Sequence, residues 1–342
     1  MRAVSFVKWH FWCLLPGPAL AHPWYSVGVC EELAPGERYR RKRGSRRGGD
    51  GQTANALVLR NAALELYSRV LEQVRRQPEG VEALIAAELN PELRTALRHM
   101  HDRVAFAREV LGFEPDPEQE PPLRSWAKRL ILNCNRQWGK STIVAIRALH
   151  RAWFWPGSLI LIVSVTQMHT ANLFQKVLEF LPALGVTGRP MTDGVNRKSV
   201  KLPNGSRIVA LAGGDFPTRS HSRVAMVIID EASMVPDPVH EAVSPTLGRT
   251  NGELVLLSTP RGKRGAFYRA WAFGGDAWER VFGPVNQSSG RISKEHLENE
   301  RNEKGSEVYA QEYLCEFFDR DSHMFNEDSI QEVFDQDLDN WE

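Results

Sequence analysis

The sequence is poor in cysteine, in long apolar runs and in net charge. Its four cysteines are scattered along 342 residues and include no CxxC pair, so neither a disulfide framework nor a structural zinc site is expected. No apolar stretch of about 18 or more residues occurs, which argues against a membrane-spanning helix. The formal net charge of +1 gives no overall sign of nucleic-acid binding.

The composition is that of a globular protein with one large domain and a small helical part. Hydrophobic residues make up 42% of the chain and charged residues 25%, which are ordinary globular values. The charge is nevertheless unevenly placed, because arginines crowd between residues 38 and 47, while residues 327–342 carry only acidic charges.

Residues 1–50 superficially match a secretory signal, with a weakly basic start, a short apolar stretch and a small-residue ending. Pro16 and Pro18 interrupt the apolar stretch. We therefore expect a disordered extension, or translation from a start codon upstream of the true one. The arginine cluster could bind nucleic acid, but a basic arm in such a leader is more typical of disorder.

Residues 51–112 are predicted to form a helical N-terminal region. Apolar residues recur at steps of three and four from 54 to 77 and again from 91 to 111, the spacing of amphipathic helices. The proline-rich stretch GFEPDPEQEPP follows. From 113 to 318 short β-rich runs alternate with helical ones, which indicates a parallel α/β domain.

The predicted strands are short apolar runs bounded by polar or turn residues. Those at 158–165 and 224–230 are continuously apolar, as expected for strands covered by helices on both faces. A Pro-Asn-Gly turn signal predicts a hairpin within KSVKLPNGSRIVAL. The fold class that follows is α/β, with a mainly parallel central sheet flanked by helices and preceded by a small helical region.

A loop that could bind phosphate follows the predicted strand LILNC at 130–134. Residues 135–142 read NRQWGKST and lead directly into an apolar helix, the order of strand, loop and helix that a P-loop requires. Such a loop directs backbone N–H groups and the helix dipole at phosphates, while Lys140 adds positive charge and Ser141 can reach Mg²⁺. Cys134 stands where the usual pattern has its first glycine, so the match is incomplete.

Two adjacent acids, Asp230 and Glu231, end the apolar strand at 224–230. In this arrangement the first carboxylate supports Mg²⁺ and the second polarises the attacking water. The alternative is that they cap a helix. A third predicted strand, ELVLLS, ends in a turn at Ser258, Thr259 and Pro260, which is either a sensor of nucleotide state or a plain turn.

Taken together, these segments resemble a phage terminase large subunit, the ATPase of the DNA-packaging motor. The resemblance covers about residues 111–330 and rests on RQWGKST, DEAS, LLSTPRGKRGAFY, RISKEHLENER and YAQEYLCEF. It implies a P-loop NTPase fold, with ATP and Mg²⁺ as substrate and cofactor.

The resemblance also implies roles for particular residues. Glu231 is the catalytic carboxylate, Asp230 supports the metal, and Ser258 to Pro260 couple hydrolysis to movement. The loop residues that bind nucleotide are Arg136, Gln137, Trp138, Gly139, Lys140, Ser141 and Thr142.

Three assignments within this scheme have open alternatives. Gln119 is expected to contact adenine. Arg136 is expected to sense or stabilise the γ-phosphate, although the residues alone make it only a loop arginine near phosphates. Arg219 and Arg223 are rival candidates for an arginine contributed to the site.

Members of this family usually continue into a nuclease domain, which we expect to be absent here. Residues 319–342 are predicted to be an acidic tail or linker, and Asp335, Asp337 and Asp339 are interpreted as solvated. The expected partners are double-stranded DNA, the terminase small subunit, the portal or procapsid and further copies in a ring, in the cytoplasm of the bacterial host and not at a membrane. The alternatives are a catalytically silent prophage remnant and another helicase-like ATPase.

Overall fold

The computed structural model describes residues 90–186, 191–192, 198–212, 223–286 and 292–318, with isolated residues between 58 and 72. The leader, the tail from 319 onward and Arg219 lie outside these residues. The chain divides into two compact units, residues 1–106 and 107–342. Within the described part, no helix combines the length and apolarity needed to cross a bilayer.

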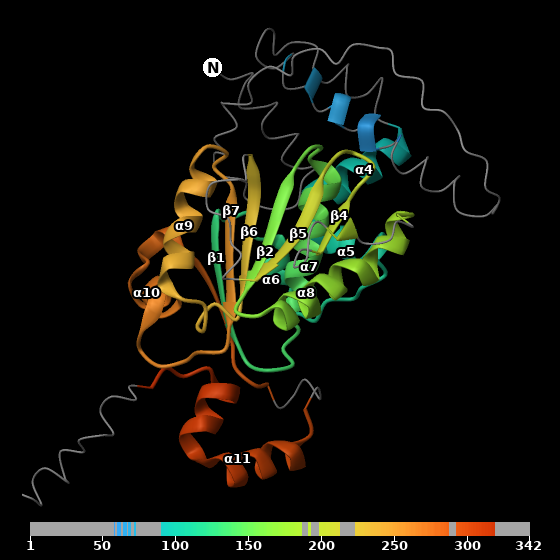
Figure 1. The fold of residues 1–342 in the computed structure, drawn as a ribbon. Helices are drawn as coiled ribbons and strands as arrows, with labels where there is room; N and C mark the ends of the chain where they lie inside the picture. Colours follow the sequence, from blue (N-terminus) through green and yellow to red (C-terminus); the bar gives the residue numbers. More distant parts are fainter. Residues whose placement is uncertain are drawn as a thin grey trace, which may run out of the picture. The chain divides into compact units, whose positions relative to one another are not determined.

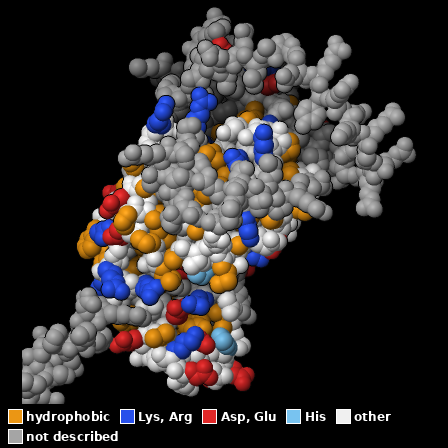
Figure 2. Space-filling model, viewed as in Figure 1, with side chains coloured by type: hydrophobic (Ala, Val, Ile, Leu, Met, Phe, Trp, Pro, Cys, Tyr) orange, Lys and Arg blue, Asp and Glu red, His pale blue; other side chains and the backbone are white. Residues whose placement is uncertain are grey.

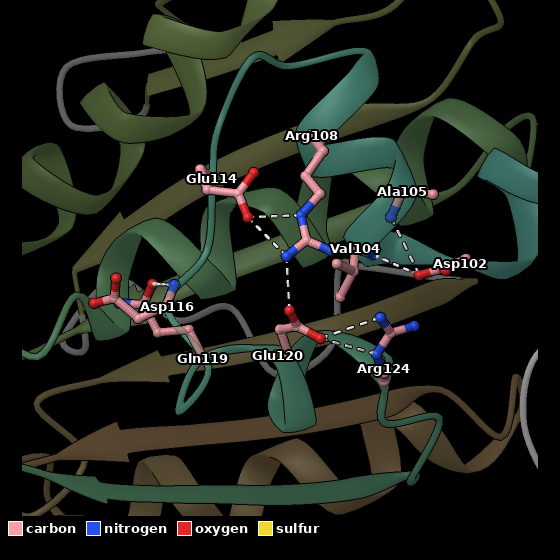
Figure 3. Close-up of polar contacts among 9 residues, drawn as sticks. All are labelled: Asp102, Val104, Ala105, Arg108, Glu114, Asp116, Gln119, Glu120 and Arg124. Carbon is pink, nitrogen blue, oxygen red and sulfur yellow. Dashed lines mark hydrogen bonds and ion pairs between the residues drawn. The ribbon is translucent and has the colours of Figure 1, made fainter.

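The helical stretch predicted from 91 to 111 is two helices, α4 (Pro91–His101) and α5 (Arg103–Glu109). Asp102 separates them, because its own N–H closes α4 on the carbonyl of Arg98 at 2.7 Å. Its carboxylate then accepts from the N–H groups of Val104, at 2.9 Å, and Ala105, at 3.2 Å (Figure 3). An aspartate that caps the next helix in this way ends the previous one, which apolar spacing alone does not reveal.

The second unit contains an eight-stranded sheet in the order β3-β4-β5-β2-β6-β7-β1-β8 (Figure 1). Six neighbouring strands, from β5 to β8 in this order, are parallel to one another, and β3 and β4 are antiparallel additions. This confirms the mainly parallel α/β sheet. The strands are β1 (Arg129–Cys134), β2 (Leu159–Ser164), β3 (Met191–Thr192), β4 (Lys198–Lys201), β5 (Arg207–Ala212), β6 (Val224–Asp230), β7 (Glu253–Ser258) and β8 (Glu279–Gly283).

Helices cover both faces of the sheet, as the continuously apolar strands require. On one face lie α7 (Lys140–Phe154) and α8 (Gln167–Phe180). The other face shares a buried core with α9 (Asp237–Gly248) and α10 (Gly265–Phe273). Short helices α6 (Glu120–Arg124) and η1 (Leu181–Leu184) and the turn η3 (Gly275–Ala277) complete the domain.

The last described segment is α11 (Lys294–Tyr309), continued by the π-helix η5 (Ala310–Leu314). Its residues return to the carboxyl end of the central strands, since the Asn133 side chain at the end of β1 donates to the carbonyl of Cys315 at 3.0 Å. Tyr309 and Tyr313 stack with ring centroids 5.0 Å apart and pack with Leu297 in a small separate core. The segment thus sits beside the edge at which open α/β sheets bind ligands.

Candidate functional site

The loop of residues 135–139 connects β1 to α7 at the carboxyl edge of the sheet. Gly139 caps α7 with φ of 94°, a left-handed conformation that glycine adopts without strain. Lys140 is therefore the first residue of a 15-residue helix, and Ser141 and Thr142 follow in its first turn. The predicted order of strand, loop and helix is confirmed, so backbone N–H groups and the positive end of a long helix meet at this loop.

Lys140 is folded back onto its own loop. Its Nζ atom donates to the main-chain oxygens of Cys134, at 2.7 Å, and Asn135, at 2.8 Å. Both acceptors are uncharged carbonyls. An anion bonds more strongly to an ammonium group than a carbonyl does, so an anion can replace them as its partner.

Asp230 is the last residue of β6 and Glu231 follows it in the next turn, and β7 lies between β6 and β1 in the sheet. Asp230 is buried, and its carboxylate accepts from the N–H of Glu231 at 3.0 Å. Burial, with the charge of Glu231 as a second cause, raises the pKa of Asp230 to about 7. The helix-cap alternative does not hold, because α9 begins only at Asp237 and has Pro236 at its N-cap.

Glu231 adopts φ of 50°, a left-handed conformation uncommon for a residue with a side chain. Its carboxylate accepts from the Ser258 hydroxyl at 3.3 Å, and that hydroxyl lies 2.8 Å from the hydroxyl of Ser233. Ser258 is fully buried at the end of β7. The structure therefore brings the first residue of the predicted coupling turn against the predicted catalytic acid.

Arg136 leaves the loop in the direction of η5. Its guanidinium pairs with the carboxylate of Glu312, with one N–O distance of 3.3 Å, and its N–H donates to the carbonyl of Glu312 at 3.4 Å. Hydrogen bonding to Glu312 is the main cause that raises the pKa of Arg136. Arg136 is thus an ion-paired residue, although its side chain keeps 65% of its surface exposed.

The rival arginines differ in position. Arg223 directly precedes β6, so the whole strand separates it from Asp230, a length of about 20 Å. The structure does not bring it to the Lys140 loop of the same chain. Arg219 falls outside the described residues.

Gln119 lies next to the loop, but its side chain is almost wholly buried. Its amide donates to the carbonyl of Trp138 at 2.7 Å and accepts from the N–H of Asp116 at 3.1 Å. The segment that carries it is fixed by ion pairs of Arg108 with Glu114 and Glu120, both 2.7 Å long (Figure 3). Gln119 therefore holds the loop backbone in place.

A shallow, open hollow lies beside this contact. Its lining combines the Gln119 segment, the loop and the chain after β8. Among the lining residues, the Asn286 side chain donates to the carboxylate of Glu118. Polar groups therefore line a shallow site next to the phosphate loop.

Sequence reasoning missed Gly283, at the end of β8. Its carbonyl accepts from the N–H of Asn135 at 2.8 Å and from the Asn135 side chain at 3.0 Å. A Cβ atom at Gly283 would lie 2.6 Å from Trp138 Nε1 and 2.8 Å from Cys134 Sγ. The absence of a side chain here lets the buried Trp138 support the loop from below.

Ser233 and Glu312 were also missed. Ser233 lies within the DEAS motif, so the sequence places it close to the two acids but does not indicate its hydrogen bond with Ser258. Glu312 is 176 residues from Arg136, and no local pattern could have paired them. Within the described residues, no group of three or more His, Cys, Asp or Glu side chains could hold a metal ion.

The model of the family described as "Terminase large subunit, T4likevirus-type, N-terminal" matches residues 131–332, more than half of the chain. The chain belongs to the terminase large subunit family. Large terminase subunits of Thermus phage G20c and Thermus virus P23-45 are each 29% identical to it over 174 residues, which is 45% of this chain and 35% of each relative. The chain thus matches about a third of the length of these curated relatives.

Solved terminase structures share the fold. The large terminase ATPase domain of Thermus phage P74-26 is 25% identical, with a TM-score of 0.52 over 61% of this chain and 96% of that domain. The large terminase of bacteriophage HK97 is 16% identical, with a TM-score of 0.53 over 64% of this chain and 55% of that one. The second likeness shows the fold alone.

Proposed function

We propose that this terminase chain is the ATP-hydrolysing part of a phage DNA-packaging motor. The observation that carries the proposal is the placement of Lys140 and of Asp230–Glu231 at the same edge of one parallel sheet, with Ser258 on the strand between them. A phosphate-binding lysine and a pair of acids around one position are the parts that phosphoryl transfer to water needs.

The phosphates of ATP would lie over the loop and the start of α7. Backbone N–H groups of the loop, through Gly139, would donate to the phosphate oxygens. Lys140 would exchange the carbonyls of Cys134 and Asn135 for phosphate. Ser141 and Thr142 supply hydroxyls in the first helical turn. Gln137 and Trp138 shape the loop, and the adenine base would occupy the hollow beside Gln119.

The residues present fit Mg²⁺, which prefers oxygen ligands and reaches a protein through few carboxylates. Ser141 offers a hydroxyl, and Asp230 offers a carboxylate whose pKa is raised to about 7 by burial and by the charge of Glu231. Mg²⁺ held by these residues would place positive charge beside the Asp230 carboxylate and the phosphate oxygens. Glu231 then polarises the attacking water, and Arg136 reaches the γ-phosphate after leaving Glu312.

Movement would start at Ser258, Thr259 and Pro260 and reach DNA through the loop that follows. Arg261, Lys263 and Arg264 in this loop are exposed. Its backbone is fixed, since the N–H of Lys263 donates to the carbonyl of Phe318 at 3.1 Å. Figure 2 shows Lys and Arg side chains on this face near α10. Cations on a fixed loop suit sequence-independent contacts to DNA phosphates.

The wider assembly is proposed from the likeness to the family. We expect the motor to work on double-stranded DNA in the bacterial cytoplasm as a ring of identical subunits. The small subunit and the portal or procapsid would be its partners.

The test is Mg²⁺-dependent ATP hydrolysis by the full chain, with and without linear double-stranded DNA. Lys140→Ala and Glu231→Gln should abolish hydrolysis, whereas Lys176→Ala, which changes an exposed lysine on α8, should not. Stimulation by DNA supports packaging. A folded wild-type protein that hydrolyses ATP no faster than the Lys140 and Glu231 variants overturns the proposal.

A further inference from the structure

A short chain of hydroxyl groups leads from the turn after β6 to the carboxylate of Glu231. The oxygens of Ser233 and Ser258 are 2.8 Å apart, and Ser258 Oγ is 3.3 Å from Glu231 Oε2. Ser258 is fully buried, and Ser233 lies in the partly exposed turn.

The number of protons available to donate sets the direction of these hydrogen bonds. A serine hydroxyl has one proton to donate, and an ionised carboxylate only accepts. If Ser258 donates to Glu231, its proton is committed, so the short contact with Ser233 requires Ser233 to donate. The bonds then run from Ser233 to Ser258 to Glu231.

The turn that carries Ser233 is held by contacts that do not involve either hydroxyl. The N–H of Ala232 donates to the carbonyl of Leu257 at 3.1 Å, and the N–H of Met234 to that of Glu231 at 2.9 Å. His240 Nε2 lies 3.1 Å from the carbonyl of Ala232. Removing the Ser233 hydroxyl should therefore leave the turn in place.

We propose that Ser233 is a positioning residue for ATP hydrolysis, acting on Glu231 through Ser258. The inference rests on the proposed function, because it concerns the acid that would activate water. Ser233 fixes the rotation of the Ser258 hydroxyl, and the Ser258 hydroxyl fixes one oxygen of Glu231. A left-handed backbone at Glu231 sets where this side chain starts, and the hydroxyl chain sets where it ends.

Loss of the Ser233 hydroxyl should affect the chemical step and spare substrate binding. Ser258 is then free to rotate toward other acceptors, and the carboxylate loses its fixed orientation. None of these three side chains belongs to the phosphate loop. We expect Ser233→Ala to lower kcat by about tenfold, the upper end of the effect of one neutral hydrogen bond, with KM for ATP within about twofold of the wild-type value.

The experiment is a double-mutant cycle in the full chain with Ser233→Ala, Ser258→Ala and the double variant. If Ser233 acts through Ser258, Ser233→Ala should have little further effect once Ser258→Ala is present. Ser233→Thr, which keeps a hydroxyl, should restore most of the wild-type rate. Ser199→Ala, on β4 at the far side of the sheet, controls for the loss of a buried serine.

Each outcome bears on a different claim. Provided that the wild-type chain hydrolyses ATP, three outcomes overturn the inference. The first is additive losses in the double variant, and the second is a wild-type rate in Ser233→Ala. The third is a Ser233→Thr variant as slow as Ser233→Ala. A wild-type chain without ATPase activity overturns the proposed function together with it. Fluorescent ATP analogue binding and thermal unfolding show whether a slow variant is folded and loaded.

Discussion

Arg147 on α7 and Glu253 at the start of β7 form a 3.0 Å ion pair in which neither side chain is more than 3% exposed. Arg147 also donates to the carbonyl of Ser125 at 2.7 Å. Burial lowers the pKa of Arg147, and the charge of Glu253 opposes that effect. The pair therefore ties the helix behind the phosphate loop to the strand that ends at Ser258.

Glu253→Gln should leave the Arg147 charge buried with much weaker compensation. We expect the free energy of unfolding to fall by roughly 3–5 kcal/mol, as when one partner of a buried ion pair is removed. Urea unfolding measures this loss. Glu179→Gln, which breaks the exposed pair of Glu179 with Lys176, should change stability little. Equal losses in the two variants would contradict the structural account.

Gly283→Ala should displace the phosphate loop. The added methyl group would meet Trp138 Nε1 and Cys134 Sγ at distances no real contact allows. We expect a raised KM for ATP and a stability loss of about 1–3 kcal/mol from overpacking. Gly248→Ala, where no atom lies within 4 Å of the new methyl group, is the control. An unchanged KM in Gly283→Ala would show that the Trp138 side chain can shift without displacing the loop backbone.

Asp230→Asn should stabilise the protein at pH 8 when nucleotide and Mg²⁺ are absent. The folded-state pKa of about 7 lies above the ordinary aspartate pKa of 3.8. The folded state thus binds more protons between these values, and stability falls as pH rises through them. At pH 5 the folded carboxyl is neutral while the unfolded one is largely ionised, so the substitution should stabilise the protein by less than at pH 8. At pH 8 we expect a gain of roughly 2–4 kcal/mol in the free energy of unfolding.

Asp237→Asn is the control of opposite sign. The pKa of Asp237 is lowered, mainly by its hydrogen bond from Arg269. Its contribution to stability is present above the ordinary aspartate pKa and is lost as pH falls. Chemical unfolding at both pH values should therefore show a small loss for Asp237→Asn at pH 8. A loss for Asp230→Asn at pH 8 would mean that its carboxylate is compensated in the free protein.

Cys134 and Cys315 should resist alkylation in the folded protein. Both thiols are buried, and burial raises the pKa of Cys315 to about 12 and that of Cys134 further. Because the thiolate is the nucleophile, labelling at pH 8 should be slow until denaturant is added. Peptide mass spectrometry assigns the label to each cysteine. Labelling of Cys134 at the rate of an unfolded chain would show that the loop opens readily.

The central strands could be predicted closely because the sequence marks both of their ends. The apolar runs of β6 and β7 begin and stop at the residues the sequence suggests, since Asp230 and Ser258 follow unbroken hydrophobic residues. β8 was missed because ERVFG is short and mostly exposed, as an edge strand is, and has no apolar run. β8 forms through its pairing with β1, and such a strand shows little pattern in its own sequence.

The candidate site divides in the same way. Lys140, Asp230 and Glu231 follow from local motifs, and the fold that brings them to one edge follows from the parallel sheet. The partners of Arg136 and Gln119 could not be predicted, because each contact depends on packing between segments far apart in sequence. The role expected for Gln119 at adenine stays a prediction, and its observed contact is with the loop backbone.

The position of β7 sets a limit on its length. Its register places Ser258 opposite Asn133 of β1 and Leu257 opposite Asp230 of β6. Successive side chains of a strand point to opposite faces, so deletion or insertion of one residue would turn Ser258 away from Glu231. Natural variation in this strand should therefore include changes of apolar residue type, while single-codon insertions and deletions between Glu253 and Ser258 should be missing from functional genes.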